Sequence, residues 1–238
     1  MRRVAGVGTV ILLRHGRSTA NTAGVLAGRT PGVVLDEHGQ AQAQALAERL
    51  AQLPLAAVVS SPLQRCRETV APLAQARELE VTIDDRFIEM DYGDWTGREL
   101  RKLAKESLWK VVQAHPCAAV FPGGEGLAAM QARAVAAVRE WDAKLAVEYG
   151  PQVLWLVCTH GDIIKAVLAD ALGVHLDGFQ RIVANPCSVS AVTYTETRPF
   201  VQRVNDSGDD LRSLIPPKRR RQRRLSSDAT PGGATGAS

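Results

Sequence analysis

Two arginines, two histidines and a glutamate stand where apolar segments of the sequence end. Arg14 and His15 follow the first apolar run, Arg65 comes shortly after the second, Glu89 lies beyond the third, and His160 follows a later one. Ligands of open α/β sheets bind outside the carboxyl ends of the strands. We therefore expect these side chains to meet at one edge of a sheet.

Such a set can hold a dianion and transfer a proton. Guanidinium groups match the oxygens of a phosphate with paired hydrogen bonds. A neutral imidazole is a competent nucleophile, and a covalent intermediate divides one difficult step into two. A nearby carboxylic acid can protonate the leaving alcohol. Because phosphoryl transfer depends mainly on positioning and on neutralising charge, this scheme needs no metal ion.

The elements that would position these residues alternate between strand-like and helix-like patterns. We expect strands at residues 9–13, 55–59, 81–83, 153–158, 189–194 and 200–204, and helices at 36–53, 61–76, 128–149 and 163–172. Asp36 is a candidate N-cap, and Ser61-Pro62 is a typical helix start. This order predicts an α/β layer fold with a mostly parallel sheet.

Composition and charge limit the class of protein. Of the 238 residues, 45% are hydrophobic and 23% are charged, which excludes a disordered chain, a coiled coil and a collagen-like fibre. The first apolar run is too short to span a bilayer. Residues 212–238 hold seven Lys/Arg and one Asp, so the remainder carries a formal charge of −2. The basic pI therefore gives no argument for a nucleic-acid partner.

The pattern stops at about Ser207. We expect one domain over 1–206 and a disordered basic tail over 207–238. The basic run at 218–224 could bind nucleic acid or acidic lipid, but it has no aromatic residue on which a base could stack. A solvated tail with weak nonspecific affinity is the favoured interpretation.

The four cysteines argue against other chemistries. None belongs to a C-x-x-C pair, which disfavours a zinc site and favours a reduced, cytoplasmic protein. None is followed six residues later by the arginine that cysteine phosphatases require. His160 and Asp162 could face the same way as a metal pair, but no third ligand has motif spacing. We expect no metal and no cofactor.

Five segments resemble motifs of a known family. Arg14-His15-Gly16-Arg17-Ser18-Thr19-Ala20-Asn21 is similar to the R-H-G-x-[ST]-x-x-N signature of the histidine phosphatase superfamily, which includes the cofactor-dependent phosphoglycerate mutases. The family's other motifs are matched in order at 60–69 (S-S-x-x-x-R-x-x-x-T), 89–97 (E-x-x-x-G-x-W-x-G), 159–161 (T-H-G) and 185–188 (the late N-x-S motif). The resemblance covers about residues 8–205 and is closest to the actinobacterial branch often labelled as phosphomutases or phosphatases. Five motifs in order are far more specific than one.

The resemblance implies a three-layer α/β/α sandwich of the phosphoglycerate mutase type and a role for each motif residue. His15 would become phosphohistidine, Glu89 would be the proton donor and then the base for water, and His160 would complete the catalytic set. The implied phosphate-binding residues are Arg14, Asn21, Arg65 and the backbone N–H of Gly161. The implied supporting residues are Gly16, Ser18 and Thr69, with Ser18 and Thr69 beside the arginine side chains.

The resemblance alone does not distinguish a phosphatase from a mutase. The family's mutases carry Glu after R-H-G and an insertion with paired arginines. This chain has Arg17 at that position, the form G-D-W-T-G at 93–97, and only the single Arg98 and Arg101 in the corresponding region. We therefore favour a metal-independent phosphoric monoester hydrolase acting on small organic phosphates. The alternatives are a phosphoglycerate mutase-type isomerase and a non-catalytic phospholigand or nucleic-acid binding protein.

Simpler interpretations of single residues are also open. His15 could be a capped turn histidine, Arg65 a surface helix charge, and Glu89 an ion-pair partner of Arg86 or Arg98. We expect pocket walls from 25–30 and from 95–125, with Trp109 and Phe121 among them, and His115 is a candidate for the same wall. His38 and His175 are expected on the surface. A homodimer is an expectation from the family, and the physiological substrate and pH optimum stay open.

Overall fold

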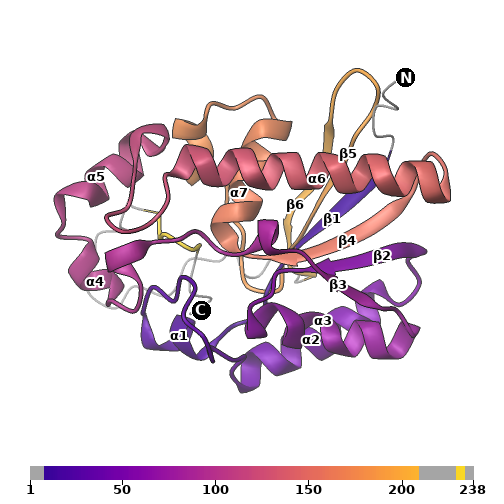
Figure 1. Ribbon diagram of the computed structural model, residues 1–238. Coiled ribbons are helices and arrows are strands. Elements are labelled where there is room, and N and C mark those ends of the chain that lie inside the picture. The colour runs from indigo at the N-terminus through magenta and orange to yellow at the C-terminus, as the bar shows by residue number, and fades with distance from the viewer. Residues whose placement is uncertain (1–7, 209–228, 234–238) are drawn as a thin grey trace, which may run out of the picture.

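The computed structural model describes residues 8–208 and 229–233. In these residues, a sheet of six strands lies between two layers of helices (Figure 1). The strands are β1 (Thr9–Arg14), β2 (Leu55–Ser60), β3 (Val81–Ile83), β4 (Leu154–Thr159), β5 (Val189–Thr193) and β6 (Phe200–Asp206), in the order β3-β2-β4-β1-β5-β6. The first four pair in parallel, and β5 and β6 add antiparallel strands at one side.

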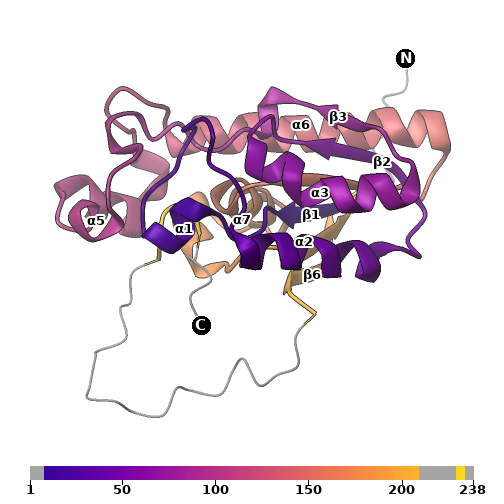
Figure 2. The same cartoon turned by 90° about the horizontal axis from the view of Figure 1, so that it is seen from below.

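Helices cover both faces of the sheet. They are α1 (Thr19–Ala23), α2 (Glu37–Leu50), α3 (Gln64–Arg77), α4 (Leu100–Leu103), α5 (Ser107–Ala114), α6 (Leu127–Tyr149) and α7 (Gly161–Ala171). The pair α2 and α3 lies on one face, and α6 and α7 lie on the other (Figures 1 and 2). The expected three-layer sandwich with a mostly parallel sheet is confirmed. No helix among the residues described here is long and apolar enough to cross a membrane.

The central strand β1 explains why the sheet is buried on both sides. Val10 and Leu12 belong to the core beneath α6 and α7. Ile11 and Leu13 belong to the core beneath α2 and α3. Successive side chains of a strand point to opposite faces, so a strand covered on both faces reads as an unbroken apolar run. The polar residues that follow this run are thereby fixed at the centre of the sheet edge.

Local sequence sets the first residue of helix α2, whereas tertiary contacts set the first residue of helix α3. Asp36 is the N-cap of α2, and its Oδ1 accepts a hydrogen bond from the Gly39 N–H at 2.8 Å, as predicted. Helix α3 begins at Gln64 rather than at Ser61-Pro62. Ser61 stays outside the helix because its backbone N–H bonds to the end of β4 and its hydroxyl contacts His160.

The predicted division into a domain and a tail stays a prediction, because most of the tail lies outside the described residues. The basic run at 218–224 is among the residues that are not described. Residues 229–233 are the exception, since they are placed against the body of the protein. Ala229 and the side chain of Gln113 on α5 exchange two hydrogen bonds of 2.8 Å.

Candidate active site

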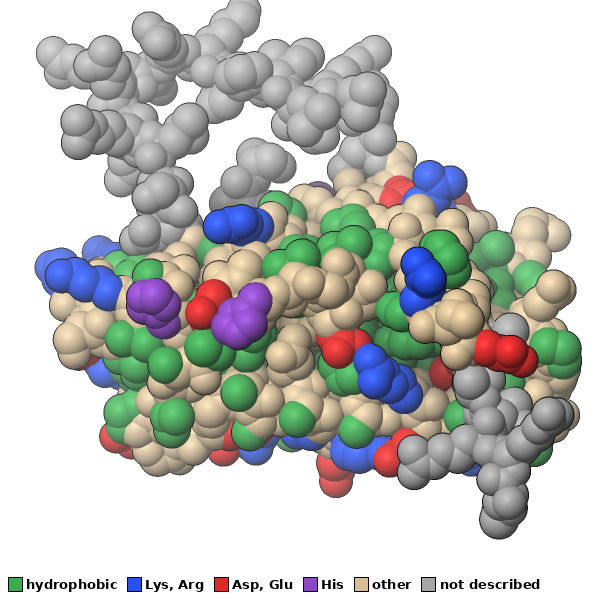
Figure 3. All heavy atoms as spheres, turned by 90° about the horizontal axis from the view of Figure 1, so that it is seen from above, with side chains coloured by type: hydrophobic (Ala, Val, Ile, Leu, Met, Phe, Trp, Pro, Cys, Tyr) green, Lys and Arg blue, Asp and Glu red, His purple; other side chains and the backbone are tan. Residues whose placement is uncertain are grey.

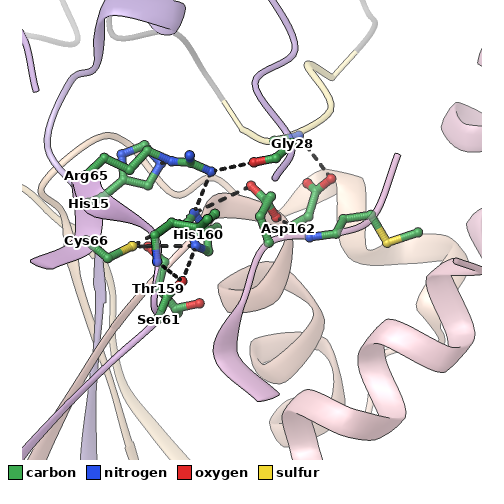
Figure 4. A network of polar contacts seen from close by, with 12 residues as sticks. His15, Gly28, Ser61, Arg65, Cys66, Thr159, His160 and Asp162 are labelled. Carbon is green, nitrogen blue, oxygen red and sulfur yellow. Dashed lines mark hydrogen bonds and ion pairs between the residues drawn. The ribbon is translucent and has the colours of Figure 1, made fainter. Parts of the chain in front are cut away.

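Adjacent strands bring the predicted residues together. Arg14 ends β1, His15 follows it, and His160 follows the neighbouring strand β4 as the N-cap of α7. Arg65 is in the first turn of α3, which follows β2 on the other side of β4. The rings of His15 and His160 have centroids 5.2 Å apart, and Arg65 contacts both (Figure 4). The sheet edge therefore carries the expected cluster.

The hydrogen bonds of His15 define its tautomer. Nδ1 lies 2.7 Å from the Gly16 carbonyl oxygen, which can only accept, so Nδ1 carries the proton. Arg65 Nε donates to Nε2 at 3.3 Å, so Nε2 presents a lone pair. Burial, together with the charges of Arg65 and Arg14, lowers the pKa of His15 well below its ordinary value. His15 is thus a neutral imidazole with Nε2 available as a nucleophile.

Two buried guanidinium groups carry charges that act on His15. Arg14 is fully buried and donates from Nη1 to the Ala184 carbonyl at 2.7 Å. Burial lowers the pKa of Arg14 to about 10. Arg65 is 2% exposed, and its Nη2 donates to the Gly28 carbonyl at 2.8 Å. Its Nη1 is buried and has no hydrogen-bond partner among the residues described. Buried polar groups almost always have partners, so this atom favours an anionic ligand beside it.

The second histidine is also neutral. His160 is fully buried, and its Nδ1 lies 3.2 Å from Arg65 Nη2, which can only donate. Its Nε2 therefore carries the proton and donates to Ser61 Oγ at 2.8 Å. Burial and the charge of Arg65 lower the pKa of His160 well below its ordinary value. Ser61 was not among the predicted site residues, although it belongs to the matched S-S motif.

Glu89 has the properties of a proton donor. It is 3% exposed, its Oε1 accepts from the Met90 N–H at 2.9 Å, and its Oε2 lies 3.9 Å from His160 Nδ1. Burial, and next the charge of Asp162, raise the pKa of Glu89 to about 7. The interpretation of Glu89 as an ion-pair partner of Arg86 or Arg98 is wrong. Those arginines pair with other carboxylates, and Glu89 faces the interior.

A network that the sequence did not predict holds the Glu89 backbone. Its carbonyl accepts from Arg29 Nε at 2.9 Å and from Arg133 Nη2 at 3.3 Å. Glu125 Oε1 binds both arginines, at 2.9 Å to Arg29 and 2.6 Å to Arg133. The same oxygen accepts from the Asp91 N–H at 2.9 Å. Glu125 therefore fixes the two side chains that hold the backbone of Glu89.

This network leads to a prediction for Glu125→Gln. The amide cannot balance two guanidinium groups, so the Glu89 segment should lose its fixed position. We expect kcat for an aryl phosphate to fall about 3- to 30-fold, because small displacements of a reacting group are costly. Steady-state kinetics with Glu106→Gln as the control would measure it, since Glu106 is in an exposed ion pair with Arg98. Wild-type kcat in Glu125→Gln would contradict the positioning role.

The expected supporting residues join the chain segments around His15. Thr69 Oγ1 donates to the Arg65 carbonyl at 2.6 Å and accepts from the Gly16 N–H at 2.9 Å, so it ties α3 to the end of β1. Ser18 caps α1 and donates from Oγ to Asn21 Oδ1 at 2.9 Å, not to an arginine. Ser18 and Asn21 both line the pocket.

Asp162 does not form a metal pair with His160. It is 1% exposed and accepts from Tyr92 Oη at 2.8 Å and from Lys165 Nζ at 3.0 Å. These partners occupy its carboxylate oxygens, while the ring nitrogens of His160 contact Ser61 and Arg65. Neither Tyr92 nor Lys165 was predicted as part of the site. Gly161, the first residue of α7, lies at the helix N-terminus where backbone N–H groups favour an anion.

The pocket over these residues is narrow. Its free space is about 30 Å³, and its lining comprises Arg14, His15, Ser18, Asn21, Val25, Leu26, Ala27, Gly28, Arg65, Glu89, Tyr92, Leu100 and residues 230–233. The expected wall at 25–30 is therefore present through residue 28, while the segment 95–125 contributes Leu100. Trp109 and Phe121 do not line it, because they pack with Trp95 in the core.

His115 is also absent from the pocket, because it lies on the surface near His175 and Asp177. Figure 3 shows two histidine side chains with an acidic side chain between them on this face. Cys117, His175 and Asp177 are close enough to hold a metal ion. However, Asp177 Oδ1 accepts from the Cys117 N–H at 3.0 Å, and His175 Nδ1 accepts from the Asp177 N–H at 3.3 Å. These bonds give the residues a structural role at two short 3-10 helices, Pro116–Ala118 and Leu176–Arg181.

Comparisons with known proteins point to one family. The sequence profile of the histidine phosphatase superfamily (branch 1) matches residues 10–207. Phosphoserine phosphatase 1 of Hydrogenobacter thermophilus is 31% identical over 202 residues, which cover 82% of this chain and 91% of that protein.

Solved structures of the same kind superpose on this fold. Bacillus stearothermophilus YhfR has a TM-score of 0.76 at 25% identity, with 84% of this chain and 97% of that chain covered. Mycobacterial glucosyl-3-phosphoglycerate phosphatase in complex with VO3 has a TM-score of 0.74 at 25% identity, with 83% and 98% covered.

Proposed function

This chain belongs to the histidine phosphatase superfamily, and from that premise we propose that it hydrolyses phosphate monoesters of small organic alcohols through a phosphohistidine at His15. It is a phosphoric monoester hydrolase. The observation that carries the mechanism is the arrangement around His15. The Nε2 of a neutral imidazole accepts from the buried Arg65, the charge of the buried Arg14 also acts on His15, and a buried carboxyl with a raised pKa lies 3.9 Å from His160.

In the first half-reaction, His15 Nε2 attacks phosphorus. The N–P bond forms as the bond from phosphorus to the ester oxygen breaks, and Glu89 gives its proton to that oxygen. Arg14 and Arg65 hold the equatorial oxygens and stabilise their charge, and His160 orients Arg65 by accepting a hydrogen bond at Nδ1. The Gly161 N–H and Asn21 add contacts to the same group. The alcohol leaves, and Glu89 is left as a carboxylate.

In the second half-reaction, Glu89 acts as the base. Its carboxylate takes a proton from water as the water oxygen attacks the phosphorus bound to His15. The N–P bond breaks, and its electron pair returns to Nε2. Inorganic phosphate leaves, and both the protonated Glu89 and the neutral His15 are restored.

Hydrolysis is favoured over isomerisation by the pocket wall. The arginines between Trp95 and Glu125 do not line the pocket, because Arg98 pairs with Glu106 and Arg101 with Glu99. A phosphoglycerate mutase needs such cations for the second acid group of its substrate. Apolar lining from Val25, Leu26 and Leu100 suits a small organic group instead. A cytoplasmic location, a homodimer and the lack of a nucleic-acid partner stay predictions from the sequence.

The test follows phosphate release from p-nitrophenyl phosphate, phosphoserine and 3-phosphoglycerate in EDTA. We expect release from at least one ester. Phosphorus NMR of the 3-phosphoglycerate reaction compares release with formation of 2-phosphoglycerate, and isomerisation that outpaces release would contradict a phosphatase. Salt-sensitive DNA binding that is lost on truncation at Ser213, without turnover of any ester, would favour a binding protein.

A further inference from the structure

Residues 229–233 lie across the mouth of the candidate active site. Besides the two hydrogen bonds between Ala229 and Gln113, the Gly232 N–H donates to Asp162 Oδ2 at 3.0 Å. Figure 4 shows this yellow segment passing close to Gly28 and Asp162, above the catalytic residues. These contacts join the segment to α5 and to the first turn of α7.

The backbone of the two glycines occupies space that a substrate would need. The Gly232 carbonyl is so close to Gly161 that a Cβ at Gly161 would lie 2.4 Å from its oxygen. A Cβ at Gly233 would lie 2.8 Å from Arg14 Nη1, and one at Gly232 would lie 3.9 Å from Glu89 Oε2. Arg14 and Gly161 are the groups assigned to the phosphoryl oxygens, and Glu89 is assigned to the leaving oxygen.

Two features suit the segment to this position. Gly232 and Gly233 have φ angles of +76° and +86°, a conformation that disfavours any side chain. Pro231 before them restricts the free chain and reduces the entropy lost on docking. The free space left in the pocket is about 30 Å³. Residues 230–233 line this pocket together with Arg14 and His15, so the docked segment takes up part of the space that a phosphate ester would need.

We propose that residues 229–233 are a built-in competitor of the substrate, which must leave the pocket before a phosphate ester can bind. This inference rests on the proposed function, because it takes the same residues as the substrate site. The docked segment lowers the fraction of binding-competent protein. The apparent affinity for phosphate and the apparent kcat/KM fall in proportion to the fraction of protein that is competent to bind.

Two full-length variants test the competition. Gln113→Ala removes both hydrogen bonds to Ala229 without touching the catalytic residues, and Gly233→Val places a side chain against Arg14. We expect kcat/KM for p-nitrophenyl phosphate to rise about 2- to 10-fold in Gln113→Ala, as suits the loss of one or two hydrogen bonds. In Gly233→Val, kcat/KM should rise by at least the same factor. Gln131→Ala is the control, since its amide donates to Ala166 on α7 and not to the segment.

Binding of inorganic phosphate, measured by calorimetry, gives a readout that is independent of turnover. In each variant, the Kd for phosphate should fall by the factor by which kcat/KM rises. In Gln131→Ala the Kd should stay unchanged. Unchanged or weaker phosphate binding in both variants, at wild-type Tm, would overturn the proposal. Tighter phosphate binding without hydrolysis of any ester would support the competition while contradicting the hydrolase assignment, so the two failures can be told apart.

Discussion

Replacing His15 with alanine is expected to lower kcat for phosphate release by roughly 10⁴-fold or more, as for other covalent nucleophiles. The reason is the position of Nε2, which Gly16 keeps deprotonated and Arg65 orients. His160 is not placed to take over the attack, because it uses one ring nitrogen for Ser61 and the other for Arg65. Water attacking directly would lose the benefit of a nucleophile already in place.

The same variant tests the intermediate. Rapid quenching with radiolabelled phosphoserine or another ester that turns over should trap a phosphoenzyme in the wild type. The label should be lost in acid and kept in base, as for a phosphoramidate. His38→Ala is the matched control, because His38 is exposed on α2. Equal labelling of wild type and His15→Ala would place the phosphoryl group on another residue.

The sequence predicted that these side chains would lie together because each of them follows a strong local signal. Arg14 and His15 follow a run of four apolar residues, 10–13, and Thr159-His160-Gly161 follows another apolar run. Once parallel pairing places β1 beside β4, these residues must be neighbours. The main strands and helices were likewise predictable from apolar patterning, within a few residues at their ends.

The residues that hold Glu89 left no such signal. Arg29, Glu125 and Arg133 are far apart in the sequence, and their contacts depend on tertiary structure. The docking of residues 229–233 is hidden for a related reason. Its bonds come from the backbone of Ala229 and Gly232, so a stretch of small residues resembles any flexible tail.

The aromatic residues show another limit of prediction from the sequence. Trp109 and Phe121 lie in a segment without clear periodicity, and such residues were expected to line the pocket. Instead Phe121 meets Tyr92 at a centroid distance of 5.1 Å and Trp95 at 5.2 Å. Large apolar rings gain most from full burial, so the segment buries its aromatics in the core that also holds Val10 and Leu12. Smaller residues such as Leu100 are left to face the pocket.

Glu89→Gln is expected to lower kcat for an alkyl phosphate about 10²- to 10⁴-fold at pH 6, the usual contribution of general acid–base catalysis. Glutamine fills a similar space but has no proton to give to the leaving oxygen. The loss should be smaller with p-nitrophenyl phosphate, whose leaving group departs without protonation. Glu140→Gln, an exposed glutamate on α6, is the control. Equal losses with both esters would contradict the role of proton donor.

The dependence of kcat/KM on pH is a second test of Glu89 as the proton donor. The pKa of Glu89 is raised to about 7, because burial and the charge of Asp162 disfavour its carboxylate. The carboxyl is protonated below that pH and can act as an acid, so kcat/KM should fall as pH rises through about 7. On the acidic side, the lowered pKa values of His15 and His160 keep both imidazoles neutral well below pH 6.5. In Glu89→Gln the alkaline decline should disappear, and a decline that persists unchanged would assign it to another group.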